Sequence, residues 1–188
     1  MQKLLILDSN SLMNRAFYAS PPLTNDEGIH TNAIYGFTNM LLKMKDDINP
    51  DYIIAAFDRK APTFRHQEYG DHKAGRKKMP DELAEQFPLV KELLNALGIK
   101  IYELDGFEAD DIIGTTAKIA SNEGMEVYIV TGDKDALQLA DDNINVIITK
   151  KGVSETANYN KETFIKEFEV TPTQFIDVKW LMGDKSDN

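Results

Sequence analysis

The run Lys3-Leu4-Leu5-Ile6-Leu7-Asp8 decides the fold that this sequence predicts. Its apolar residues follow one another without alternation, which is typical of a strand buried on both faces of a parallel sheet. A second run of this kind, 52–57, is also followed by an aspartate, Asp58. Antiparallel strands usually expose one face and alternate, so the two runs favour a mainly parallel sheet.

Helical and strand patterns alternate along the rest of the chain, which predicts an α/β fold with helices flanking the sheet. We expect Pro88 to kink or split the helix that starts near Pro80. A short helix should follow Asp135, and another should start at Asn160. The predicted strands are 3–7, 52–57, 99–104, 127–131 and 145–149, and the main predicted helices are 9–18, 31–47, 80–97, 109–122 and 172–182.

Three carboxylates fall within four residues at the start of the predicted helix 109–122. Glu108 and Asp111 are spaced i and i+3 and share a helix face, and Asp110 can reach the same centre from one side. Lys and Arg are absent from the whole stretch 105–111. Clustered carboxylates repel and raise each other's pKa, so the stretch predicts a bound cation.

Other acids follow strand ends, where ligands bind in open α/β sheets. Each could separately be a turn residue or a helix cap, but together they converge on one edge of the predicted sheet. Oxygen ligands in a chain without cysteine suit Mg²⁺ or Mn²⁺, and so many acids predict two or more ions. The candidate ligands are Asp8, Asp58, Glu108, Asp110, Asp111, Asp133, Asp135, Asp184 and Asp187.

The formal net charge of −10 over 188 residues argues against a polyanionic partner, but its distribution points the other way. The segment 59–78 holds seven Lys and Arg against two acids, interleaved with aromatic residues. It predicts an exposed nucleic-acid contact, and a solvated charged loop is the alternative. Without cysteines or an apolar run near ~20 residues, we expect a cytoplasmic protein of one domain that has no membrane partner.

Several motifs together resemble the flap endonuclease and 5′→3′ exonuclease family, which includes the 5′-nuclease domain of bacterial DNA polymerase I. They occur in the family's order and span essentially the whole chain. The motifs are Leu5-Ile6-Leu7-Asp8-Ser9-Asn10-Ser11-Leu12, Arg15-Ala16-Phe17-Tyr18, 57–66, 69–76, Gly106-Phe107-Glu108-Ala109-Asp110-Asp111, Thr131-Gly132-Asp133-Lys134-Asp135 and Gly183-Asp184-Lys185-Ser186-Asp187-Asn188.

The resemblance implies a PIN-like (Rossmann-like) sheet with a basic helical arch at about 59–90. It also implies metal-dependent cleavage of 5′ ends and 5′ flaps on nicked or branched duplex DNA, in primer removal and repair. The nine acids would hold the ions directly or through water, and Lys73 and Arg76 would be catalytic cations near the scissile phosphate. The implied DNA contacts are Arg15, Arg59, Phe64, Arg65, His72, Lys77 and Lys78.

The sequence departs from the family where Ser9 replaces a frequent Gly and where His72 replaces a common Tyr. Family members continue into a Gly-rich helix-hairpin-helix segment, so we expect 1–188 to be the catalytic domain of a longer polypeptide that includes this segment and, by resemblance, a polymerase domain. A catalytically incomplete DNA-binding fragment is one alternative. A haloacid-dehalogenase-type phosphatase is another, but it needs a second carboxylate where Asn10 stands.

Overall fold

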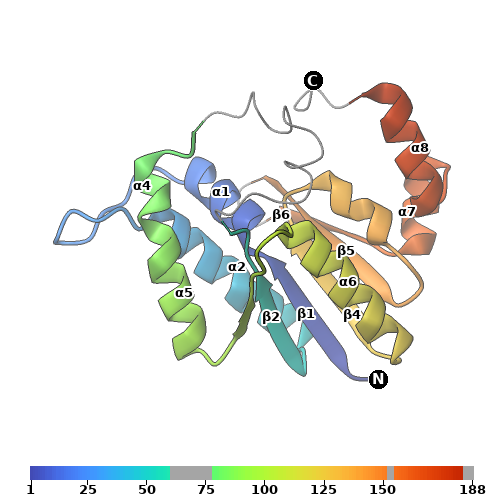
Figure 1. The fold of residues 1–188 in the computed structure, drawn as a ribbon, viewed down its shortest axis with the longest axis horizontal. Coiled ribbons are helices and arrows are strands. Elements are labelled where there is room, and N and C mark those ends of the chain that lie inside the picture. The colour runs from blue at the N-terminus through green and yellow to red at the C-terminus, as the bar shows by residue number, and fades with distance from the viewer. Residues whose placement is uncertain (60–77, 152–154, 184–188) are drawn as a thin grey trace.

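A six-stranded sheet in the order β3-β2-β1-β4-β5-β6 forms the centre of the molecule (Figure 1). The computed structural model describes residues 1–59, 78–151 and 155–183. All neighbouring strands are parallel except β6, which pairs antiparallel with β5. The strands are β1 (Lys3–Asp8), β2 (Tyr52–Ala56), β3 (Lys100–Tyr102), β4 (Glu126–Thr131), β5 (Ile144–Lys151) and β6 (Glu155–Tyr159).

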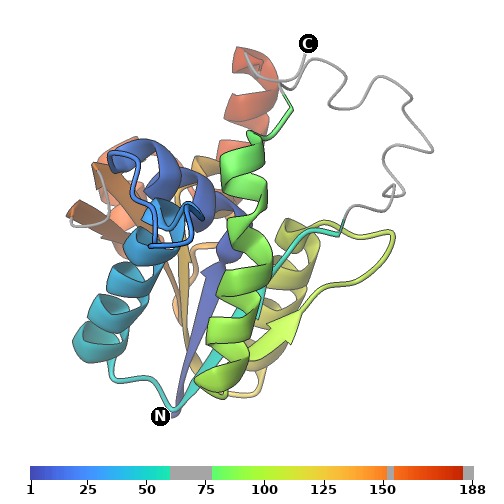
Figure 2. The same ribbon diagram turned by 90° about the vertical axis from the view of Figure 1, so that its left-hand side faces the viewer.

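Helices cover both faces of this sheet. Leu5 and Leu7 of β1 pack into one core with α1, α2 and α5, and Figure 2 shows α2 and α5 side by side on this face. Leu4 and Ile6 point the opposite way and pack with α6 and α7. The helices are α1 (Ser9–Ala19), α2 (Asn32–Ile48), α4 (Asp81–Ala84), α5 (Gln86–Ala96), α6 (Ala109–Asn122), α7 (Lys161–Phe168), α8 (Pro172–Met182) and the 3₁₀ helix η1 (Lys134–Leu139).

The predicted α/β fold and its mainly parallel sheet are confirmed, and the helix predicted to start near Pro80 is split into α4 and α5, with the break at Glu85. Helix α5 starts at Gln86, so Pro88 lies in its first turn, where the missing N–H does no harm. Strand β6 was not predicted, because an edge strand pairs through its backbone and its residues carry no clear apolar alternation. In the described part of the chain, no helix combines the length and apolar character that a membrane crossing requires.

The side chain of Gln86 joins three helices on the face opposite α6. Thr31 precedes α2 but gives it no side-chain cap. Instead Oε1 of Gln86 accepts from the backbone N–H groups of Ala33 (2.9 Å) and Ile34 (3.2 Å). Its Nε2 donates to Oδ1 of Asn32 (3.1 Å) and to the carbonyl of Glu82 (2.8 Å). We call this group the Gln86 junction; it fixes α4 and α5 to the start of α2.

Candidate functional site

Four aspartates meet at the carboxyl-terminal edge of the sheet, and we call them the carboxylate site. Asp8 ends β1, Asp58 follows β2 and Asp133 follows β4. Asp110 enters from the first turn of α6. The strand order reverses between β1 and β4, so Asp8 and Asp133 lie at the topological switch point, where α/β sheets bind their ligands.

Asp8 is buried and is held in place by two donors. Its Oδ1 accepts from the backbone N–H of Ser11 (3.2 Å), and its Oδ2 accepts from the hydroxyl of Thr131 (2.6 Å). Burial raises the pKa of Asp8 to about 6, the two hydrogen bonds oppose this shift, and the charges of Asp58 and Asp133 add to it. The carboxylate therefore keeps a fixed orientation while its negative charge is poorly stabilised.

Asp110 has the most perturbed carboxyl group of the site. Its pKa is raised to about 7, first by desolvation in the surrounding protein and then by the charges of Asp8, Asp133, Asp58 and Glu108. Part of the Asp110 side chain is still exposed, so the desolvation is incomplete and the neighbouring carboxylates are an important part of the shift. This repulsion shows that the topology has brought acids from four separate segments together.

Asp58 links the end of β2 to the start of α6. Its Oδ1 accepts from the backbone N–H of Ala109 (2.7 Å), and its own N–H donates to Oδ1 of Asn10 (3.0 Å). This arrangement gives α6 an acceptor from another strand and sets the helix start beside Asp8. The sequence motifs include Asn10 and Thr131, but they were not predicted to hold the aspartates, although polar residues at a strand end and a following helix start were a usable signal.

Asp111 has a different neighbourhood from Asp110, although the two are adjacent in sequence. One oxygen of Asp111 accepts from the backbone N–H of Glu108 (3.0 Å), which is half of a capping box at the start of α6. The charge of Glu108, in turn, is one of the causes that raise the pKa of Asp110. The predicted shared face of Glu108 and Asp111 is thus used, at least in part, to begin the helix.

Asp133 and Asp135 lie on the turn from β4 into η1. Oδ1 of Asp133 accepts from the backbone N–H of Asp135 (2.8 Å), and the N–H of Asp133 donates to the hydroxyl of Thr131 (2.9 Å). Thr131 therefore connects Asp133 to Asp8. Asp135 forms an ion pair with Lys179 of α8. This ion pair directs the Asp135 side chain toward α8.

The donor set fits a hard divalent cation, since it consists of carboxylate oxygens. Their mutual repulsion contributes to the raised pKa values of Asp8 and Asp110. Within residues 1–59, 78–151 and 155–183, no three His, Asp or Glu side chains are placed closely enough to make a preformed metal site. Asp184 and Asp187 lie outside the described residues. The assignment of all nine acids as ligands stays a prediction.

The predicted DNA-contacting cations that the structure describes have protein partners. Arg15 donates to the carbonyls of Thr149 (2.6 Å) and Lys150. Arg59 pairs with Asp105 (3.1 Å), and the exposed Lys78 pairs with Asp81 (3.1 Å). The predicted catalytic and DNA-contacting residues outside the described part are Phe64, Arg65, His72, Lys73, Arg76 and Lys77. Most of the predicted arch, 60–77, lies there too.

Residues 3–169 match the family model of the 5′-3′ exonuclease N-terminal, resolvase-like domain. The chain belongs to this family. Membership of the 5′-3′ exonuclease family confirms the resemblance seen in the sequence and decides against a phosphatase of the haloacid dehalogenase type.

Relatives in the 5′-3′ exonuclease family are much longer than this chain. DNA polymerase I of Bacillus subtilis (strain 168) is 50% identical over 187 residues, which cover 100% of this chain and 21% of the relative. DNA polymerase I of Geobacillus stearothermophilus is 52% identical over 186 residues, which cover 99% and 21%. The chain thus spans about a fifth of the length of these curated relatives.

Two solved structures show the same fold. The T5 5′-exonuclease with bound zinc ions has a TM-score of 0.75 at 21% identity, covering 100% of this chain and 69% of that one. The catalytic core of Rad2 in complex with a DNA substrate has a TM-score of 0.57 at 17% identity, covering 100% and 56%. The likeness to these nucleases confirms the predicted PIN-like sheet flanked by helices.

Proposed function

We propose that this chain is a divalent-metal-dependent, structure-specific DNA nuclease that hydrolyses phosphodiesters at 5′ ends and 5′ flaps, in primer removal and repair. The proposal rests on the convergence of Asp8, Asp58, Asp110 and Asp133 at the switch point of the sheet, where neighbouring charges help burial to raise the pKa of Asp8 and of Asp110. Membership of the 5′-3′ exonuclease family supports the choice of substrate.

The carboxylate site and the acids beside it would hold two or more Mg²⁺ or Mn²⁺ ions. When bound, such ions supply an activated water and stabilise charge on the transferring phosphoryl group. The chain's own residues set the geometry: Thr131 and the Ser11 N–H orient Asp8, and Asp58 orients the start of α6. Preorganisation of this kind avoids reorganisation of the acids during the reaction.

Cations would complete the site on the DNA side. From the resemblance alone, Lys73 and Arg76 would stabilise charge on the scissile phosphate, and the other predicted contacts would bind the flap or the duplex. Zinc ions in the T5 5′-exonuclease and DNA in the Rad2 complex support divalent ions and DNA as ligands of this chain.

The test is cleavage of an end-labelled 5′-flap duplex by the 188-residue chain in Mn²⁺, Mg²⁺ or EDTA. We expect metal-dependent release of the flap, with no release in EDTA and none by Asp110→Ala. Glu123→Ala at the other end of α6 is the matched control and should cleave like the parent. Undiminished cleavage by Asp110→Ala would exclude the proposed site.

The alternative is a DNA-binding module without catalysis. Fluorescence anisotropy of the same flap duplex in EDTA separates the two functions, because binding does not require the reaction. Flap binding in EDTA without cleavage in either metal would support the binding module. Absence of both binding and cleavage would contradict both functions for this chain.

A further inference from the structure

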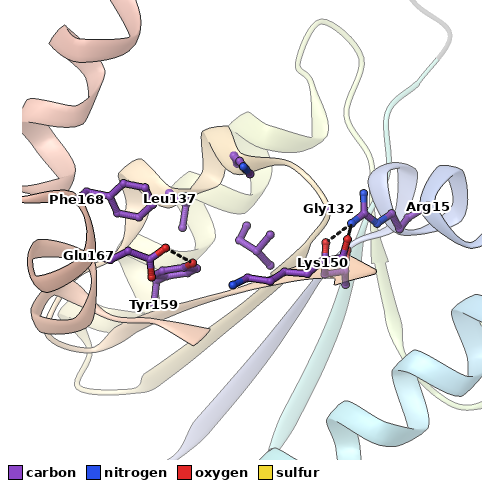
Figure 3. Close-up of a pocket in the computed structure, with 10 residues that line it drawn as sticks. Arg15, Gly132, Leu137, Lys150, Tyr159, Glu167 and Phe168 are labelled. Carbon is purple, nitrogen blue, oxygen red and sulfur yellow. Dashed lines mark hydrogen bonds between the residues drawn. The ribbon is translucent and has the colours of Figure 1, made fainter. Parts of the chain in front are cut away.

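A cavity of about 310 Å³ opens next to the carboxylate site (Figure 3). It lies between η1, the ends of β5 and β6, and the last turn of α7. Gly132 and Lys134, which flank Asp133 in the sequence, both line it. The cavity therefore begins one residue from the predicted metal ligand Asp133, although none of the predicted ligands that the structure describes lines it.

The charge of the cavity lining is positive in a protein whose net charge is −10. Its cations are Arg15, Lys134 and Lys150, and its one carboxylate is Glu167. Within the described residues, neither lysine has an ion-pair partner, as is also true of Lys166 on α7, whereas Lys118, Lys161 and Lys179 are paired. Arg15 donates to two backbone carbonyls, which do not cancel its charge.

The remaining carboxylate is turned toward the protein. Glu167 accepts a hydrogen bond from the hydroxyl of Tyr159 (3.0 Å), as Figure 3 shows. Lys150 extends along the cavity toward the same tyrosine without pairing with Glu167. The two free ammonium groups can therefore attract an anion from solvent, which would place its charge next to them.

Apolar side chains form the other part of the lining. Leu137 and Ile148 are buried, and the ring of Tyr159 lies 5.9 Å from that of Phe168. A cavity whose lining combines an apolar wall with two lysines suits a ligand with a flat organic part and an anionic group. A bare inorganic ion would leave the apolar wall unused.

We propose that this cavity binds one nucleotide unit, with its phosphate at Lys134 and Lys150 and its nucleoside against Tyr159 and Leu137. The volume is near the lower limit of about 300 Å³ for small-molecule sites, which suits one nucleotide and excludes a longer segment. The choice of a nucleotide over other phosphorylated molecules rests on the proposed nuclease function. The unit is either the end of a DNA strand or a free nucleoside monophosphate.

The experiment is calorimetric titration of the 188-residue chain with dAMP, inorganic phosphate and deoxyadenosine, all in EDTA so that no cleavage or metal bridging occurs. We expect saturable binding of dAMP, with weaker binding of both fragments. Lys134→Gln and Lys150→Gln should each weaken dAMP binding by about tenfold or more, because each removes a charged hydrogen-bond donor. Both lysines are exposed, so the variants should fold.

Lys100→Gln is the matched control, since Lys100 is also exposed and lies at the start of β3, at the opposite edge of the sheet. No saturable dAMP binding, or equal weakening by all three substitutions, would overturn the proposal. If inorganic phosphate binds as tightly as dAMP, the proposed contact of the nucleoside with Tyr159 and Leu137 is overturned, and the cavity is only an anion site. A 5′-phosphorylated oligonucleotide that competes with dAMP would assign the unit to a strand end, and failure to compete would assign it to a free nucleotide.

Flap cleavage in Mn²⁺ keeps this proposal separate from the proposed function. If the chain cleaves flaps but dAMP does not bind, only the nucleotide cavity is excluded. If dAMP binds in the lysine-dependent way but flaps are not cleaved, the cavity is supported and the nuclease function is contradicted.

Discussion

Gln86 and Asp8 are both buried polar residues, yet their surroundings have opposite character. Gln86 makes four hydrogen bonds, which satisfy both its donors and its acceptor. Asp8 accepts two hydrogen bonds but faces the charges of Asp58 and Asp133, and its own charge raises the pKa of Asp110. The junction stabilises the fold, whereas the carboxylate site costs stability unless a cation is present.

The largest expected effect is on flap cleavage, and it should distinguish Asp110 from its sequence neighbour Asp111. Asp110→Asn should lower flap cleavage in Mn²⁺ on the order of 10² to 10³-fold, the loss typical when one electrostatic group leaves a transition-state site. Asp111→Asn should lower it less, since its amide oxygen can still accept from the Glu108 N–H. Single-turnover cleavage rates of the two variants make this comparison. Equal losses would mean that the capping hydrogen bond does not distinguish these neighbours.

Breaking the Gln86 junction should have the next largest effect. Gln86→Leu leaves the N–H groups of Ala33 and Ile34 without their acceptor inside the protein, so the free energy of unfolding should fall by about 3 kcal/mol. Urea denaturation measures the change. Gln138→Leu, at an exposed position in η1, is the control and should stay within about 0.5 kcal/mol of the parent. A similar small change in both variants would show that the junction contributes little.

The carboxylate site should make the metal-free protein less stable as pH rises from about 4 to 7. The pKa of Asp8 is 3.8 in its ordinary state and about 6 in the fold, so between these values the folded chain binds more protons than the unfolded chain. Ionisation of Asp8 at higher pH then lowers the free energy of unfolding on the order of 2 kcal/mol, and the more exposed Asp110 adds a smaller part.

Urea denaturation in EDTA at pH 4.5, 6 and 7.5 tests this dependence, with Asp8→Asn as the variant that should flatten it. An acid whose pKa is lowered in the fold, such as Asp141, makes the protein more stable as pH rises, but this change occurs only at lower pH. Mn²⁺ at pH 7.5 should restore stability in the parent and less so in Asp8→Asn. A parent whose stability rises through this range would contradict the picture of repelling carboxylates.

The smallest expected effect comes from Ser9, the neighbour of Asp8. Its hydroxyl is fully buried and has no hydrogen-bond partner among the residues that the structure describes. Ser9→Ala removes an unsatisfied polar atom, so the free energy of unfolding should rise by about 1 kcal/mol. Ser121→Ala on α6 controls for helix propensity in the same thermal and urea measurements. A loss of stability in Ser9→Ala alone would show that the hydroxyl has a partner in solution.

Local patterns were sufficient to predict many elements. Helix α6 and helix α8 have the predicted bounds, because an acidic first turn and a Thr171 capping box with Pro172 mark where they begin. The aspartates at or just after the ends of β1, β2 and β4 could be predicted to converge, since parallel strands end at one edge of a sheet. Strand β6 could not be predicted, because backbone pairing with β5 forms it and its side chains are mostly not buried.

Contacts between distant residues explain the rest. The cap that Gln86 gives to α2 joins positions more than 50 residues apart, and the Thr131 hydroxyl reaches Asp8 across 123 residues. Such hydrogen bonds leave no periodic signal in the sequence. The same is true of the cavity beside η1, whose two lysines come from different segments and line one cavity only because β5 lies next to β4.

The sequence by itself determined the α/β class, the family and the acids available for a metal site, because apolar runs, caps and motif order are properties of short segments. Only the tertiary structure decided how these acids are used. It directs Asp110 toward Asp8 and Asp133, assigns one Asp111 oxygen to a helix cap and pairs Asp135 with Lys179. The physical reason is that burial, repulsion and hydrogen bonding depend on distances across the sheet, which chain topology sets.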